Sequence, residues 1–512
     1  METSRPQPAH DIALAKENLR LREEVAQLLL DVSDLKAMLR YLQGTRFAPS
    51  SERDMSNQPF LIPPVPGEQV SDDDDEDGEV KGHKRKKKRQ GLPKGVATDV
   101  IQHDLAEDEK VCATHGIALE KTGEKILNQV EWIPAKIEIK EHHLPRYSCS
   151  ICDCVVKETP PPPSPIPGSM ATPSLLAQIA CSKYADGLPL YRQEGILRRH
   201  GLELTRTTMA TWMVRLGELV TPLFNLFSDT LVLGSVMYMD ETHLQVLSVP
   251  GKRATTKSYL WVRVGGTDDQ KVVLFDFGPG RHAEVALRLV KGFQGYIHTD
   301  GYDPAYDKVE AIPGIIRVQC WMHVRRTFKT ALKTLGKAGK GGICAQAISR
   351  IKALYAIERE TAALSPEQRC LVRQEKAKPL LDSFKVWLDE HAHLIPPKSV
   401  TGKAMAYALN RWPALLIYLD DGRLKMDNGP AENAIRPVAI GRKNWMFSDS
   451  VAGAHASAMI YSIIETAKAN GLDPHAYLSR VIDRLPHAKT LADIEALLPW
   501  ATPPPAPLAA VS

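Results

Sequence analysis

The sequence predicts a multidomain protein of mixed α and α/β class. Its length of 512 residues exceeds what one hydrophobic core normally supports, so several domains are expected. Leucines repeat every seven residues near the N-terminus, and two pairs of residues with metal-ligand spacing follow. Further along, residues 234–320 alternate between short apolar runs and turn residues, which is typical of an α/β sheet. We therefore expect an N-terminal coiled coil, a small zinc-ribbon-like domain, and an α/β domain with a helical insertion.

The heptad repeat predicts a leucine-zipper coiled coil over residues 8–44. Leucine fills the d positions, and the a positions hold Asn18, Val25, Val32 and Leu39. β-branched residues at a with leucine at d favour two parallel helices, and one Asn at a fixes their register. A single amphipathic helix packed on the body is the alternative, although it does not require so strict a repeat. We expect a homodimer or higher oligomer whose interface contains Leu14, Asn18, Leu21, Val25, Leu28, Val32, Leu35, Leu39 and Leu42.

The next segment, residues 45–105, has the composition of a disordered charged linker. An acidic run at 72–77 precedes a basic run at 84–89, with scattered Pro and Gly. Such blocks of like charge contain too little apolar surface to form a core. The linker is expected to solvate the chain or to tether it to DNA without sequence preference.

A zinc-finger-like domain is predicted over residues 106–158. Cys112 and His115 form one half-site, and Cys149 and Cys152 form a second. Two such pairs can close a tetrahedral site for a structural Zn²⁺ ion. Cys154 is an alternative ligand, and scattered reduced thiols with a surface histidine are the alternative to a metal site.

Residues 170–230 are expected to be helical and to resemble a helix-turn-helix. Helical patterns cover 173–185, 189–199 and 206–217, and Gly201 lies in the turn between the last two. In this interpretation DNA is contacted by Arg198, Arg199 and Arg206. An ordinary helical bundle remains the alternative.

The first part of the catalytic core is predicted at 231–324. Strands are expected at 234–247, 258–264, 271–277, 296–299 and 315–320, with a helix at 282–290. Three meandering strands, a helical crossover and further short strands match the ribonuclease-H-like architecture. In that fold one acidic residue lies on the first strand and another just after the fourth. Asp240 and Asp300 occupy those places.

A third acid, Glu432, falls near the start of a predicted helix. Carboxylates brought together from distant positions suit Mg²⁺, which prefers oxygen ligands. Two such ions can activate an attacking oxygen and stabilise a leaving one in phosphoryl transfer. Asp427 is the rival third carboxylate. Taken singly, each acid also fits a turn or a helix start.

The gap between Asp300 and Glu432 is too long for a simple connection. We expect a helical insertion at 325–400, with the second part of the core at 401–470 and a helical segment and tail at 471–512. Between Arg325 and Glu390 there are 14 Lys or Arg against seven Asp or Glu. That surplus suits a phosphate backbone, although a solvated basic face is the alternative.

Three motifs resemble those of one family. They are RFAPSSER at 46–53, CWMHVRRTF at 320–328 and ENAIRPVAIGRKNWMF at 432–447. The chain resembles, from about residue 10 to about residue 490, the insertion sequence 66 family of bacterial DDE transposases. The resemblance implies that Asp240, Asp300 and Glu432 hold two Mg²⁺ ions. It also implies four cysteines in the zinc finger, from which His115 departs, and small accessory proteins from the same element.

Several basic or aromatic residues near these motifs are predicted to contact DNA. Arg and Lys bind phosphate, and an exposed Trp stacks on an unpaired base. No metal is assigned to Cys320 and His323, because the sequence offers no second half-site nearby. The expected DNA-binding residues are His323, Arg325, Arg326, Arg436, Arg442, Lys443 and Trp445.

Composition limits the remaining function classes. The net charge of +4 implies that DNA contact depends on local patches, and no stretch reaches the about 18 apolar residues that a membrane span needs. Eight cysteines without a paired framework favour a reducing compartment. A cytoplasmic, nucleoid-associated protein with no signal peptide is expected.

Together these features predict a DNA transposase. It would bind element-end DNA, cleave it to leave a 3′-hydroxyl and join that end to target DNA by two-metal phosphoryl transfer. A ribonuclease-H-like nuclease without strand transfer is the first alternative. A catalytically inactive DNA-binding protein is the second.

Overall fold

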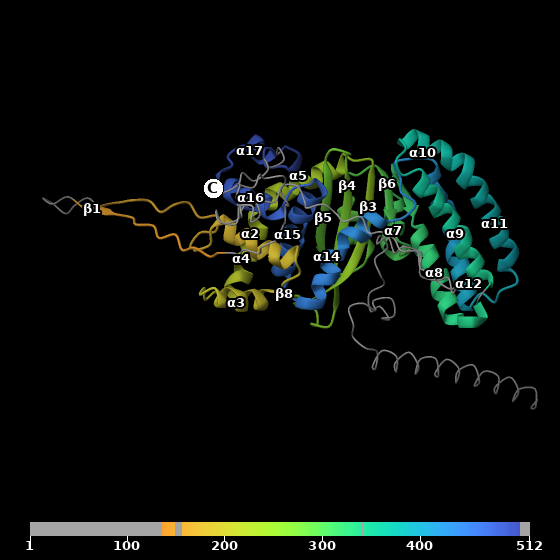
Figure 1. The fold of residues 1–512 in the computed structure, drawn as a ribbon, viewed down its shortest axis with the longest axis horizontal. Coiled ribbons are helices and arrows are strands. Elements are labelled where there is room, and N and C mark those ends of the chain that lie inside the picture. Colours follow the sequence, from red (N-terminus) through yellow and green to blue (C-terminus); the bar gives the residue numbers. More distant parts are fainter. Residues whose placement is uncertain (1–135, 149–155, 340, 502–512) are drawn as a thin grey trace, which may run out of the picture. The chain divides into compact units, whose positions relative to one another are not determined.

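The computed structural model describes residues 136–148, 156–339 and 341–501 (Figure 1). The predicted coiled coil, the charged linker and the four predicted zinc ligands lie outside these residues. Within the described part of the predicted zinc-finger region, strands β1 (Arg146–Ser148) and β2 (Val156–Glu158) pair antiparallel.

A mixed sheet with the strand order β5-β4-β3-β6-β7 forms the centre of the fold. Its first three strands are an antiparallel meander: β3 (Val236–Ser248), β4 (Lys257–Gly266) and β5 (Lys271–Gly278). The chain then crosses through helix α6 (Ala283–Leu289) to β6 (Gly295–Thr299), which pairs parallel with β3. Helix α7 (Asp303–Glu310) leads to β7 (Ile315–Gln319), which pairs parallel with β6. All five predicted strands and the crossover helix are confirmed within two residues.

In Figure 1 the sheet lies between two groups of helices. The group beside β5 combines segments from both ends of the described chain. Its members are α2 (Pro173–Tyr184), α3 (Leu190–Arg199), α4 (Arg206–Leu219), α5 (Thr221–Val232), α15 (Val451–Ala469), α16 (Pro474–Arg484) and α17 (Leu491–Glu495). The three predicted helical segments therefore correspond to α2, α3 and α4.

Helix α15 joins this group to the sheet. It packs on α4 so closely that a Cβ at Gly217 would lie 2.6 Å from the Cα of Ala456. On another face, α15 covers the edge strand β5 and forms hydrogen bonds with its backbone. Thr466 Oγ1 accepts from the Val273 amide at 3.0 Å and donates to the Val273 carbonyl at 2.9 Å, and Ser462 Oγ accepts from the Phe275 amide at 2.7 Å. Side chains thus satisfy backbone groups that an edge strand otherwise leaves unpaired.

The second group of helices lies beside β6 and β7 and spans residues 321–416. It consists of α8 (Trp321–Leu335), α9 (Ile343–Glu360), α10 (Pro366–Val372), α11 (Lys378–Ala392), α12 (Val400–Asn410) and α13 (Trp412–Leu416). It has its own apolar core, in which the rings of Trp321, Phe384 and Trp412 contact one another. Buried Arg373 pairs with Glu358 through two contacts of 2.8 and 2.6 Å and bonds three backbone carbonyls.

The chain returns to the sheet through α14 (Gly429–Trp445) and β8 (Ser448–Ser450), which pairs parallel with the far end of β3. Five short helical turns complete the described elements: η2 (Gly336–Gly339), η3 (Arg373–Ala377), η4 (Ile417–Leu419), η5 (Leu485–His487) and η6 (Pro499–Ala501). Among the described residues, no helix combines the length and apolar character that a bilayer span requires.

Candidate active site

The register of two parallel strands brings Asp240 and Asp300 together. Tyr238 of β3 pairs with His298 of β6, and β6 ends one residue later at Thr299. Asp240 lies two residues after Tyr238, still within β3, and Asp300 lies two residues after His298, just past the end of β6. Their carboxylate oxygens, with one from Glu241, all lie within 4.8 Å of one another.

The backbone at Asp300 is held from two sides. Arg317 of β7, which is 4% exposed, donates to Thr299 Oγ1 at 3.0 Å and to the Asp300 carbonyl at 3.2 Å. From the second group of helices, Arg411 at the end of α12 donates to the Gly301 carbonyl at 2.7 Å. A Cβ at Gly301 would lie 2.2 Å from Tyr407 Oη, so a larger residue here would displace the Tyr407 side chain. These contacts fix the direction in which the Asp300 carboxylate leaves the sheet.

Glu432 reaches the same region from the first turn of α14. Asn428, the fully buried residue before that helix, donates from Nδ2 to the Met239 carbonyl at 2.7 Å. The backbone N–H of Asn428 also donates to Cys320 Sγ at 3.2 Å. The start of α14 is therefore pinned to β3 beside Asp240, although the three acids are far apart in the sequence.

The acids influence one another electrostatically, although the ligand atoms of Glu432 group with those of Cys320 and His323 and not with those of Asp240 and Asp300. Burial raises the pKa of Asp240 well above its ordinary value, and the charges of Glu241, Asp300 and Glu432 raise it further. Burial also raises the pKa of Glu432 to about 8; Arg326 opposes this increase, whereas Asp427 and Asp300 add to it. Carboxyl groups in this position are destabilised as anions unless a cation joins them.

A fourth acid, Glu241, was not among the predicted site residues. Its side chain is fully buried, accepts a hydrogen bond from Tyr306 Oη at 2.7 Å and pairs with Arg281. Arg281 also reaches Asp300, with Nη2 and Oδ2 2.9 Å apart, and lies over the Tyr302 ring. Burial raises the pKa of Glu241 to about 7. Regular strand alternation would direct neighbouring residues such as Asp240 and Glu241 to opposite faces of the sheet, so the sequence pattern gave no signal that both belong to this cluster.

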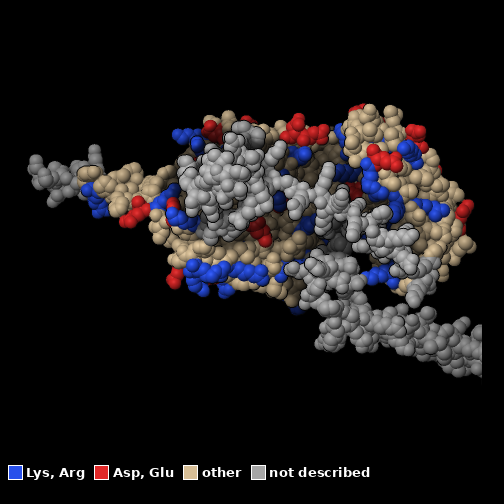
Figure 2. Space-filling model, in the orientation of Figure 1, with Lys and Arg blue, Asp and Glu red and all other residues tan. Residues whose placement is uncertain are grey.

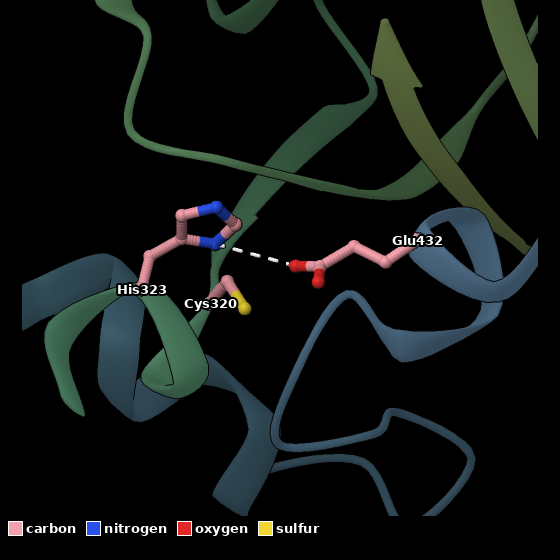
Figure 3. Close-up of side chains that lie close together, drawn as sticks. All are labelled: Cys320, His323 and Glu432. Atoms are coloured by element: carbon pink, nitrogen blue, oxygen red, sulfur yellow. Dashed lines mark ion pairs between the residues drawn. The ribbon is translucent and has the colours of Figure 1, made fainter. Parts of the chain in front are cut away.

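Cys320 and His323 lie close to Glu432 (Figure 3). His323 Nδ1 is 3.5 Å from Glu432 Oε1, and Arg326 Nη2 is 3.6 Å from Glu432 Oε2. Burial, followed by the charge of Arg326, lowers the pKa of His323 to about 4. Two of the residues predicted to contact DNA, His323 and Arg326, thus contact an acid of the site.

The rival carboxylate Asp427 has its own partners. Its Oδ1 accepts from the Gly429 amide at 3.1 Å, and its Oδ2 accepts from Tyr355 Oη at 3.1 Å. The first bond closes the turn before α14, and the second ties that turn to α9. Both oxygens of Asp427 are therefore occupied by protein donors.

The predicted DNA-binding residues at the end of α14 differ in exposure. Arg442 donates to Thr242 Oγ1 at 3.2 Å and to the His243 carbonyl of β3, and Trp445 is half-buried against the core. These contacts hold Arg442 and Trp445 against the protein, whereas Lys443 is exposed. Arg325 and Arg436 lie on α8 and α14, respectively.

Exposed arginines form a basic surface along α3 and at the start of α4. Arg198, Arg199 and Arg206 are all exposed, together with Arg192 and Arg215. Figure 2 shows the corresponding row of Lys and Arg over this part of the molecule. By contrast, α4 turns Met209, Trp212 and Leu216 into the core. The arginines of this region thus gather mainly on α3 and the first turn of α4.

The sequence matches four family models. The model described as Transposase IS66 family covers residues 168–456, and the IS66 C-terminal element follows over 462–500. The zinc-finger binding domain of transposase IS66 matches residues 109–153, which contain all four predicted zinc ligands but not Cys154. A leucine-zipper model, described as transposase C of IS166 homeodomain, matches residues 34–97 and thus contains only the last part of the heptad repeat.

Proteins of Sinorhizobium fredii are similar to this chain. Uncharacterized protein y4qI is 33% identical over 512 residues, which cover 95% of this chain and 92% of the relative. Uncharacterized protein y4jD is 31% identical over 504 residues, with 94% and 97% covered. Uncharacterized protein y4hP is 30% identical over 403 residues, with 75% and 72% covered.

Proposed function

Because the chain belongs to the IS66 family of transposases, we propose that it cleaves the ends of its own DNA element and joins them to target DNA. Asp240, Asp300 and Glu432 are the catalytic residues in this proposal. The observation that carries it is the register of β3 and β6, which aligns Asp240 with Asp300 while Asn428 pins the start of α14 beside them. A ribonuclease-H-like catalytic domain is supported by the antiparallel meander followed by two parallel strands.

The residues at this site fit divalent cations. Asp240, Asp300 and Glu432 offer carboxylate oxygens, which are the ligands that Mg²⁺ prefers. Buried Glu432 Oε1 has no hydrogen-bond partner, and burial, together with the charges of neighbouring acids, raises the pKa values of Asp240 and Glu432. When bound, two Mg²⁺ ions would activate the attacking oxygen and stabilise the leaving one.

The protein's own residues orient the acids. Arg317 and Arg411 fix the backbone at Asp300, and Arg281 holds one Asp300 oxygen while pairing with Glu241. The hydrogen bond from Asn428 to Met239 fixes the start of α14, the helix that carries Glu432. The reaction needs no nucleophilic side chain, since a water molecule and then a DNA 3′-hydroxyl supply the attacking oxygen.

DNA is proposed to lie across the basic surfaces. The exposed arginines of α3, with Arg206 and Lys443, are placed to bind phosphate, and the helical insertion carries a surplus of positive charge. We assign supporting DNA contacts to His323, Arg325, Arg326, Arg436, Arg442 and Trp445. Several of these side chains must leave present protein contacts to do so.

Strand transfer is the reaction that tests the proposal. Purified protein incubated with labelled element-end DNA, target DNA and Mg²⁺ is expected to yield joined products, and Asp240→Asn is expected to yield none. Nicked element ends without joining would assign the chain to nucleases. Unaltered DNA that is nevertheless bound would identify an inactive DNA-binding protein.

We further propose that Cys112, His115, Cys149 and Cys152 hold one structural Zn²⁺ ion. Metal analysis should find about one zinc per chain in the wild type and none in Cys149→Ser. Cys154→Ser is the matched control and should retain the metal. Retained zinc in a Cys149→Ser, Cys152→Ser double variant would contradict the site.

A further inference from the structure

Cys320, His323 and Glu432 converge from three positions of the fold. Cys320 lies between β7 and the first residue of α8, His323 lies in the first turn of α8, and Glu432 lies in the first turn of α14. One ligand atom from each lies within 4.8 Å of the other two, and the close-up shows the side chains pointing toward one another (Figure 3). The fold therefore supplies the third ligand that the local sequence lacks.

Two buried atoms of this cluster have no hydrogen-bond partner. Glu432 is only 4% exposed, yet its Oε1 makes no hydrogen bond, and neither does His323 Nδ1. The two atoms are 3.5 Å apart. Around a tetrahedral ion with metal–nitrogen and metal–oxygen bonds near 2.1 Å, neighbouring ligand atoms are about 3.4 Å apart. The separation of the unpartnered atoms matches that spacing.

Cys320 is held as a ligand would be. Its Sγ accepts a hydrogen bond from the backbone N–H of Asn428 at 3.2 Å, and the Asn428 side chain donates to the Met239 carbonyl of β3. Such outer hydrogen bonds orient metal ligands. Sulfur, imidazole nitrogen and one carboxylate oxygen together favour a borderline transition-metal ion over Mg²⁺ or Ca²⁺.

We propose that Cys320 Sγ, His323 Nδ1 and Glu432 form a separate binding site for a borderline divalent ion of the Zn²⁺ or Co²⁺ type. With three protein ligands, the fourth position of the ion stays open to water. Glu432 belongs to both ligand sets, so an ion here withdraws it from the hard-metal site. Inhibition of Mg²⁺-dependent joining by such ions follows, and this consequence alone rests on the proposed function.

Arg326 opposes binding at this site. Its Nη1 is 3.3 Å from His323 Nε2 and its Nη2 is 3.6 Å from Glu432 Oε2. An arginine donates only, so its bond to Nε2 leaves the histidine proton on Nδ1, the atom required by the metal. The guanidinium also repels a cation. Arg326→Gln should therefore tighten metal binding, about tenfold or more.

Co²⁺ titration of the full-length chain tests the site. In a Cys149→Ser, Cys152→Ser background, about one Co²⁺ per chain should bind with a sulfur-to-cobalt charge-transfer band. Cys320→Ser should remove the band, and His323→Ala should remove the ion. Cys344→Ser is the matched control, because Cys344 is also buried but its Sγ faces Thr401 Oγ1 at 3.5 Å. The comparison can be repeated in a chain whose zinc finger is not mutated. There, Cys320→Ser should bind one Co²⁺ ion fewer than the wild type.

Two results would overturn the site: a Co²⁺ stoichiometry and spectrum unchanged by Cys320→Ser, or weaker binding in Arg326→Gln. The Co²⁺ spectrum detects metal binding at Cys320 in the absence of DNA and therefore does not depend on transposase activity. A chain that binds Co²⁺ through Cys320 but never joins DNA would therefore refute the proposed function and leave the metal site standing.

Discussion

The carboxyl groups of Glu432 and Glu241 are buried, and that of Asp240 is half-buried. Arg281 pairs with Glu241 and Asp300, and Arg326 lies near Glu432, but loss of contact with solvent still raises the pKa of Glu432, Asp240 and Glu241. Binding of a divalent ion should therefore displace protons from the site. The raised pKa values should also make the stability of the metal-free fold depend on pH.

The pKa of Glu432 makes this sensitivity measurable. Its folded value of about 8 exceeds the ordinary 4.5, so the protonated group favours the folded state. The resulting stabilisation is complete below about pH 4.5 and is lost as the pH rises through about 8. In Mg²⁺-free buffer, urea midpoints of the wild type should fall relative to those of Glu432→Gln between about pH 5 and pH 8. A difference between the two proteins that stays constant with pH would contradict the raised pKa.

The sequence predicted only some of the residues of the site. Asp240 and Asp300 could be found because strand patterns and strand order place them without knowledge of any side-chain contact. Glu241, Arg281 and Tyr306 could not, since their cluster joins a strand, a loop and a helix whose proximity only the fold creates. Asn428 was missed for the same reason: its role lies in a bond to Met239.

Among the elements, the edge strand β5 depends on a helix from the far end of the chain. Ser462 and Thr466 lie on one face of α15 and bond the backbone of β5. Alternation of apolar residues predicted β5 itself. It could not predict which element protects the edge, because hydroxyl groups on a helix carry no signal of a strand partner.

Thr466→Val tests this junction. Valine keeps the shape of threonine but leaves the Val273 amide without its partner, and an unsatisfied buried donor costs about 1–3 kcal/mol. The free energy of unfolding should fall by that amount in urea titrations. Thr230→Val is the matched control, since the Thr230 hydroxyl bonds only the Leu226 carbonyl of its own helix. Equal effects of the two substitutions would show that the contact with β5 contributes nothing.

For the whole molecule, the family matches assign a zinc finger and a leucine zipper upstream of the catalytic region. Transposition requires two element ends to be held together, which one protomer bound to one end does not achieve. The zipper is the segment whose sequence most directly implies pairing, because Asn18 and the valines at a favour two parallel helices.

Deleting residues 14–42 tests the zipper. Sedimentation should show a dimer for the full chain and a monomer for the deletion. The thermal unfolding of the catalytic region should change little, since that region has its own apolar cores. A dimer that survives the deletion would place the interface elsewhere.

Glu432, and not Asp427, is proposed to complete the set of catalytic acids, and a pair of amide substitutions compares the two residues directly. DNA affinity depends mainly on Lys and Arg, so neither change should weaken binding to the element end. Glu432→Gln removes the charge on an oxygen with no protein donor, and it should abolish nicking and joining, as should Asp240→Asn and Asp300→Asn. Asp427→Asn should retain much of the activity, because both Asp427 oxygens serve the turn and Tyr355. Joined products from Glu432→Gln, with none from Asp427→Asn, would show that Asp427 and not Glu432 is the third catalytic acid.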